Sequence, residues 1–152
     1  MKKYRLEKSV LLNCGIDELF EFHRDTNNLE KVSPQNLDVK IIKMDEVPMK
    51  QGSKVDLKIS KFGIGIKWKI KILNLESPNL ISDLQEKGPF KYWLHHHRFE
   101  EVENGTLMRD EVIFIPPFGF LGLPLVPFIN LNLTKMFEYR HLKMKEIFGA
   151  GR

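Results

Sequence analysis

With 152 residues, 42% of them hydrophobic and 29% charged, the chain has the length and composition of one globular domain, which we take to span residues 1–152. Its net charge of +4 comes from 24 basic and 20 acidic residues, and this mild excess permits an acidic partner without requiring one. A single cysteine, Cys14, excludes an internal disulfide and favours a cytoplasmic location. The N-terminus lacks the apolar core of a signal peptide, and no stretch approaches the ~20 apolar residues of a membrane span.

The first part of the chain predicts one strand followed by two short helices. Tyr4 to Leu12 alternates in the manner of a β-strand. The helix expected over 17–24 has three residues that can share one face: Leu19, Phe20 and His23. A second helical piece over 26–32 ends before Ser33-Pro34, because the residue before a proline is disfavoured in the α region.

Alternating apolar residues then predict a series of strands without another long helix. The first three runs contain Leu37, Val39 and Ile41, then Val55, Leu57 and Ile59, then Ile64 to Ile72. Turns are expected at Pro48 to Gly52 and at Lys61-Phe62-Gly63, and one more strand covers 80–85. These strands lead directly into the most informative segment of the chain.

Residues 89–119 predict a long β-hairpin, because two alternating runs flank Asn104-Gly105. Asn-Gly is the strongest short-range signal for a two-residue type I′ turn. Such a turn places Glu103 opposite Thr106 and Phe99 opposite Asp110, and it gives two opposite-charge pairs on the solvated face: Arg98 with Glu111 and Glu100 with Arg109. The other face then carries aromatic, aliphatic and a few polar residues, listed along the two strands as Trp93, His95, His97, Phe99, Asp110, Val112 and Phe114.

The end of the chain predicts an apolar loop and then one long helix. The loop over 116–127 contains four prolines and two glycines, and the period becomes helical over 128–148, with Gly149 closing the helix. One stripe of this helix carries Ile129, Leu133, Met136, Phe137, Arg140, Met144 and Ile147. The order of elements indicates an α+β fold, with an antiparallel sheet of about seven strands curled around the C-terminal helix.

The chain resembles the START-like, or SRPBCC, superfamily of helix-grip proteins, and in particular bacterial ligand-binding domains related to polyketide cyclases and dehydratases. The resemblance covers the whole chain. It rests on Gly88-Pro89-Phe90, Trp93, His95, His97, Phe99, Gly105-Thr106, Asp110, Pro116, Phe118-Gly119 and Phe137-Tyr139-Arg140. It implies a hydrophobic cavity between the sheet and the C-terminal helix, and it carries over no agreed catalytic set and no cofactor.

The first functional hypothesis is binding or carriage of a hydrophobic, lipid-like or polyketide-like molecule in such a cavity. The expected ligand-binding residues are Trp68, Trp93, His95, His97, Phe99, Asp110, Val112, Phe114, Phe118, Phe137 and Arg140. The second hypothesis is a cyclase or dehydratase in which His97, assisted by Asp110, moves a proton. The polar residues can equally form a buried hydrogen-bonded network that only fixes the sheet.

A third hypothesis is an interaction module that contacts a membrane or a protein transiently through the apolar loop 117–127. In the alternative interpretation of this loop, Phe118, Phe120 and Leu121 pack beneath the C-terminal helix as core. Two histidines and a carboxylate match a metal-binding facial triad in composition, but no further ligand is indicated and we expect no metal. The basic stripe at Lys67, Lys69 and Lys71 lacks aromatic neighbours on its own face, so we expect no nucleic-acid partner. The protein is expected to be a monomer or a dimer.

Overall fold

A computed structural model describes residues 1–34, 38–61 and 63–151 of the chain. Leu37 and Phe62, which the sequence places in a strand and a turn, lie outside the described residues. The elements occur in the order β1 (Tyr4–Leu12), α1 (Ile16–Arg24), α2 (Asn28–Val32), β2 (Asp38–Met44), β3 (Lys54–Lys61), β4 (Ile64–Glu76), β5 (Leu80–Lys87), β6 (Tyr92–Val102), β7 (Gly105–Ile115), a 3₁₀ helix η1 (Gly119–Leu125) and α3 (Val126–Phe148).

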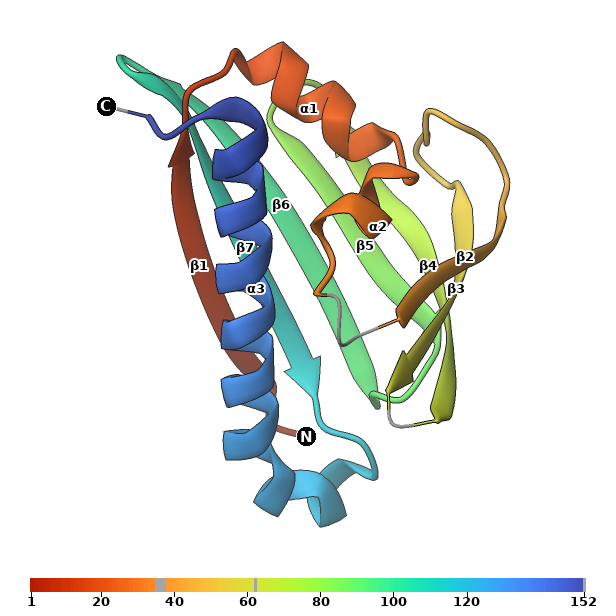
Figure 1. The fold of residues 1–152 in the computed structure, drawn as a ribbon. Coiled ribbons are helices and arrows are strands. Elements are labelled where there is room, and N and C mark those ends of the chain that lie inside the picture. The colour runs from red at the N-terminus through yellow and green to blue at the C-terminus, as the bar shows by residue number, and fades with distance from the viewer. Residues whose placement is uncertain (35–37, 62, 152) are drawn as a thin grey trace.

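The seven strands form one antiparallel sheet in the order β1-β7-β6-β5-β4-β3-β2. The chain passes from one edge strand, β1, to the other, β2, through α1 and α2. Figure 1 shows α3 lying along one face of the curved sheet, with α1 and α2 over the same face. The predicted α+β helix-grip architecture is therefore confirmed, including the two short helices after the first strand.

Two apolar clusters fill the space between the sheet and the helices. One lies under α1, where Phe20 meets Phe99 edge-on with ring centroids 5.8 Å apart. The other joins α3 to the hairpin through Phe137, Phe114 and Trp93. Ile147, which the sequence placed on the apolar stripe of α3, is 49% exposed, and Met144 and Phe148 contact the core at this end of the helix instead.

The hairpin formed by β6 and β7 keeps the predicted faces but not the predicted pairing. Val102 lies opposite Gly105, so the turn residues are Glu103 and Asn104 and every pair is displaced by two residues from the expected register. Because side chains alternate with a period of two, this displacement leaves each residue on its predicted face. Asp110 consequently lies opposite His97 rather than opposite Phe99.

The predicted charge pairs still form, but diagonally across the two strands. Arg98 Nη2 lies 3.4 Å from Glu111 Oε1, and Arg109 Nη1 lies 3.2 Å from Glu100 Oε2. The type I′ turn was wrong, since only Gly105 of the Asn-Gly pair has a positive φ, of 145°. A Cβ atom at Gly105 would lie 2.1 Å from the carbonyl oxygen of Leu12, so the close passage of β1 requires glycine at this position.

Two further boundaries differ from the sequence-based expectation. The second helix starts at Asn28 rather than at residue 26, since Asp25 Oδ1 accepts the backbone N–H of Asn27 and holds a turn there. The apolar loop contains the 3₁₀ helix η1, and α3 starts at Val126, with Pro127 in its first turn where a missing N–H costs nothing.

The segment Gly119–Phe148 is long and apolar enough to cross a membrane by length and composition, which corrects the expectation that no stretch approaches a span. In the fold, however, α3 packs Leu133, Phe137 and Met144 against the sheet. This is the arrangement of a core helix in a soluble domain.

Candidate functional site

A cavity of about 290 Å³ lies between the sheet and the helices α2 and α3, at the low end of the range of roughly 300–1,000 Å³ for ligand sites. Most of its wall is apolar and comes from β3, β4, β5, β6 and α3. Six of the predicted ligand-binding residues line it: Trp68, Trp93, His95, His97, Asp110 and Arg140. The predicted residues that line the cavity therefore include both aromatic and polar side chains.

The other five predicted ligand-binding residues do not line the cavity. Phe99, Val112, Phe114 and Phe137 are buried in the packed core, because residues of α1 and α3 cover them. Phe118 is 78% exposed at the surface. The interpretation that Phe118, Phe120 and Leu121 pack as core is wrong as well, since the last two are 68% and 71% exposed.

Asp110 on β7 is the centre of the polar wall. Its Oδ1 accepts a hydrogen bond from His95 Nε2 at 2.9 Å, and its Oδ2 accepts one from His141 Nε2 at 2.6 Å. His97 Nδ1 lies 3.0 Å from Oδ1, as an ion-pair contact without good hydrogen-bond alignment. Burial opposes ionisation of this carboxyl, but the contacts with His141, His95 and His97 outweigh it and hold its pKa well below the ordinary value.

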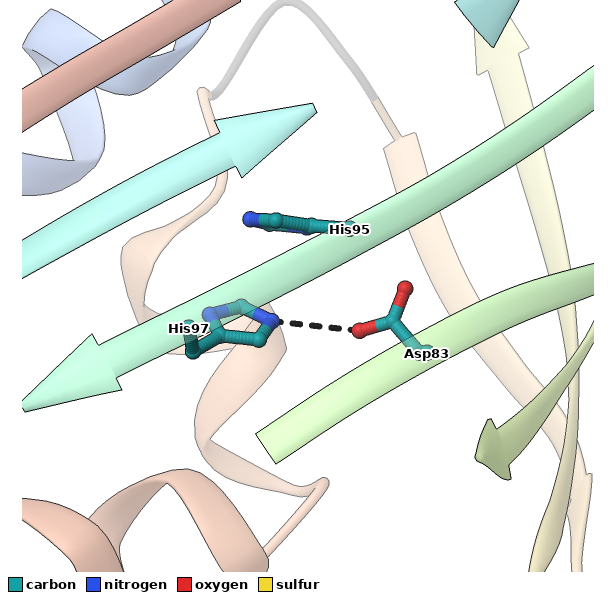
Figure 2. A group of neighbouring side chains, drawn as sticks. All are labelled: Asp83, His95 and His97. Carbon is teal, nitrogen blue, oxygen red and sulfur yellow. Dashed lines mark hydrogen bonds and ion pairs between the residues drawn. The ribbon is translucent and has the colours of Figure 1, made fainter. Parts of the chain in front are cut away.

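His97 lies between two carboxylates. Its Nε2 is 3.1 Å from Asp83 Oδ2 on the neighbouring strand β5 (Figure 2), while its Nδ1 faces Asp110. Burial lowers the pKa of His97, but the two carboxylates raise it further, to about 9. The pKa of Asp83 is lowered, since the contact with His97 outweighs the effect of burial. His97 is therefore an imidazolium at neutral pH, held by ion pairs on both sides.

The neighbouring imidazoles are neutral. The ring of His95 lies 3.8 Å from that of His97, centroid to centroid, and burial together with this positive neighbour lowers the pKa of His95. His23 on α1 faces His97 across 5.6 Å, and burial and the same positive charge lower its pKa to about 4. Its Nδ1 donates to the Leu19 carbonyl at 2.9 Å, which leaves a lone pair on Nε2.

His96 lies on the opposite face of the sheet, as the alternation predicted. Its Nδ1 is 2.6 Å from Ser82 Oγ. The side chains of His95 and His97 thus belong to the site, and that of His96 does not, although the three are consecutive in the sequence.

Three site residues were not predicted from the sequence: Asp83, His23 and His141. Each had a recognisable signal, because each is a polar residue at a position where the local pattern calls for an apolar one. Asp83 alternates with Ile81 on β5, and His23 shares a helix face with Leu19 and Phe20. His141 lies one helical turn after Phe137 on α3.

Asp83, His95 and His97 each offer one potential metal-ligand atom within 4.8 Å of the others (Figure 2). Two histidines and a carboxylate match a facial triad in composition. However, a cation at this point would have to displace the proton of His97, whose two nitrogens both face carboxylates. The arrangement is better described as an ion-pair network, and we retain the expectation that no metal is held.

Solved structures with the same fold include proteins of several kinds. A protein from Chromobacterium violaceum superposes with a TM-score of 0.75 at 12% identity, covering 98% of this chain and 99% of its own. The di-domain ARO/CYC StfQ from the steffimycin biosynthetic pathway gives a TM-score of 0.75 at 11% identity, covering 97% of this chain and 50% of its own. Ginseng major latex-like protein 151 from Panax ginseng gives 0.63 at 15% identity, covering 92% and 98%. At these identities the likeness concerns the fold.

The family follows from sequence rather than from superposition. No curated protein sequence matches the chain significantly. A family model described as "Polyketide cyclase / dehydrase and lipid transport" matches residues 14–138, which include α1 through most of α3. The chain therefore belongs to the polyketide cyclase/dehydrase and lipid transport family, within the START-like SRPBCC superfamily.

Proposed function

We propose that this protein binds a hydrophobic small molecule, lipid-like or polyketide-like, in the cavity between the sheet and α3. The single observation that supports this most strongly is the make-up of the cavity wall. Aliphatic and aromatic side chains form most of it, and four charged residues gather at one side: Asp83, His97, Asp110 and Arg140. Asp25 also lines the cavity. Apolar walls with a few convergent polar groups are typical of sites that bind small organic molecules.

Met136 offers a direct test, because it lines the cavity from α3 while the adjacent Lys135 is exposed. We expect Met136→Trp to fill part of the cavity and to weaken binding of the uncharged dye N-phenyl-1-naphthylamine at least ten-fold, as measured by its fluorescence. Lys135→Trp adds the same ring one residue away and should bind the dye as the wild type does. Wild-type protein that leaves the dye unbound, and purifies from its host without a co-purifying ligand mass, would contradict the proposal.

A cyclase or dehydratase would use histidines of the same polar wall, but their roles in proton transfer would differ from those that the sequence suggested. Because His97 is protonated at neutral pH and both of its nitrogens face carboxylates, it could not accept a proton from an enclosed substrate. The acceptor would then be His23, which is neutral and has a free Nε2 lone pair. This assignment transfers the proton-accepting role to His23, whereas the sequence suggested only that His97, assisted by Asp110, moves a proton.

A second candidate function, membrane docking, is favoured by a separate observation at the other end of α3. Here we define the apolar tip as seven exposed residues: Phe118, Phe120, Leu121, Leu123, Leu125, Phe128 and Leu131, between 41% and 78% exposed. No charged residue occurs between 116 and 134. Contiguous exposed apolar surface of this kind usually marks an interaction site.

The partner that fits the apolar tip is an anionic lipid surface. The N-terminus lies beside it (Figure 1) and brings Lys2 and Lys3 to the same end of the molecule. The Met1 side chain lies against Gly119. Lys3 Nζ is held 4.2 Å from the centroid of the Tyr92 ring. Apolar side chains flanked by basic ones bind the interface of anionic bilayers without spanning them.

Co-sedimentation with vesicles tests this second function. The wild type should sediment with vesicles containing about one-third anionic lipid and far less with uncharged ones, since attraction of Lys2 and Lys3 contributes. Phe120→Ser combined with Leu121→Ser should reduce this binding several-fold. The matched control is Leu142→Ser with Ile147→Ser, two exposed apolar residues near the other end of α3. Equal binding by both double variants would eliminate the apolar tip as a docking surface.

A further inference from the structure

The most unusual charged group of the cavity is Arg140. It lies on α3 between Met136 and Met144, one helical turn from each, and all three side chains line the cavity. The guanidinium therefore projects from an otherwise apolar stripe, on the helix side of the cavity and facing the sheet that carries the histidines. Burial lowers its pKa, which the charges of Asp110 and Asp83 only partly offset.

Among the described residues, Arg140 has no ion-pair partner within 4.0 Å, and its Nε is buried without a hydrogen-bond acceptor. A buried guanidinium nitrogen without an acceptor is costly, because that N–H has lost its hydration and gained no hydrogen bond in return. In a stable fold such a group calls for a partner that arrives from outside the chain.

The nearby carboxylates are already engaged. Asp110 faces three imidazoles, and Asp83 faces His97. His97 is likewise occupied, with both nitrogens against carboxylates. Of the two cations at the polar side of the cavity, only Arg140 therefore has donors free for a ligand.

We infer that Arg140 is an anion-recognition site and that the ligand of the cavity is an amphipathic carboxylate, with an apolar body and one planar anionic head. This inference rests on the proposed binding function and specifies its ligand class. A guanidinium presents its N–H groups in a planar fork that matches a carboxylate with two parallel hydrogen bonds. The apolar body would then lie along the remaining wall, which includes Trp68, Trp93 and Ile72.

The polar side of the cavity carries two carboxylates, Asp83 and Asp110, and two cations, His97 and Arg140, so an entering anionic head adds one negative charge. His97 is paired by contact, whereas Arg140 is attracted to the carboxylates only at longer range. One entering carboxylate supplies the contact that Arg140 lacks, and the neutral His95 and His23 nearby can take up a proton to restore the balance.

The test compares decanoate with decan-1-ol, which share an apolar chain and differ in the head group. Each competes with N-phenyl-1-naphthylamine at pH 7. We expect wild-type protein to bind decanoate at least about ten-fold more tightly than the alcohol, the ratio expected for a charge-assisted hydrogen bond in a dry site. Arg140→Met and Arg140→Gln should both lose this preference while still binding the dye, and Arg140→Lys should retain part of it.

The matched control is Lys135→Met, which removes an exposed positive charge from the same helix and should keep the wild-type preference. Equal affinity of the wild type for the two compounds, or an undiminished preference in Arg140→Gln, would overturn the inference alone, provided the dye still binds. Failure of the wild type to bind dye, alcohol and decanoate would overturn both the inference and the proposed function. Two replacements of Arg140 are included so that one poorly folding variant does not decide the result.

Discussion

Single residues of the same type have different chemical properties in this site, because their neighbours differ. His97 is cationic since it lies between Asp83 and Asp110, whereas His95, stacked against it, is neutral. Among the described residues no carboxylate lies within 4.0 Å of His23, and its pKa falls to about 4. Burial and neighbouring charges rather than residue type therefore decide which of these imidazoles carries a second proton.

The sequence predicted the contacts that form within one chain segment and missed those that join separate segments. His95, His97 and Asp110 lie on one hairpin, so alternation alone placed them on a common face. Asp83 and His141 join them only through the pairing of β5 with β6 and the packing of α3 on the sheet. Arg140 was predicted as a ligand-binding residue, but its lack of a partner is a property of the folded site that no sequence pattern reports.

At the scale of elements, the hairpin separates what the local sequence determines, which is the face of each side chain, from what it does not determine, which is the type of turn. The alternation of apolar and polar residues specified the faces of β6 and β7, and both faces are as predicted. The turn type was not specified by Asn-Gly alone, because β1 pairs with β7 and its end passes close to Gly105. A contact between segments far apart in sequence thus decided where the positive φ angle falls.

Gly105→Ala tests whether this contact determines the turn. The substitution introduces a Cβ atom 2.1 Å from the Leu12 carbonyl oxygen at a φ of 145°. We expect the free energy of unfolding, measured with urea, to fall by more than the roughly 1–2 kcal/mol attributable to a positive φ. The control is Gly52→Ala, at a φ of 91° with no atom within 4 Å of the added Cβ. Equal losses in the two variants would show that backbone strain, and not the approach of β1, is the reason for the glycine.

At the scale of the whole molecule, the ion-pair network couples global stability to pH. His97 is surrounded by charged or titratable groups from every element that packs against it: Asp110 on β7, Asp83 on β5, His95 on β6, His23 on α1 and Arg140 on α3. The pKa values of Asp83 and Asp110 are lowered on folding, so their contribution to stability is present above about pH 4 and is lost as the pH falls. His23 and His95, whose pKa values are also lowered, likewise stabilise less as the pH falls below about 6.5.

His97 acts in the opposite direction. Its pKa rises on folding from about 6.5 to about 9, so its contribution to stability is complete below pH 6.5 and is lost as the pH rises through 9. We expect the contribution of His97 to the free energy of unfolding to fall by about 2 kcal/mol between pH 6.5 and pH 8.5, while His23 and His95 together offset less than about 1 kcal/mol, so that the stability of the wild type falls overall. This window ends below the ordinary thiol pKa of 9.0, which burial of Cys14 raises to about 11 in the folded state, so Cys14 contributes little to the change. His97→Gln should remove the fall in this window, whereas His96→Gln, on the opposite face of the sheet, should keep it, because the lowered pKa of His96 acts in the opposite direction. A profile that keeps its slope in His97→Gln would mean that this imidazole is not the protonated centre of the network.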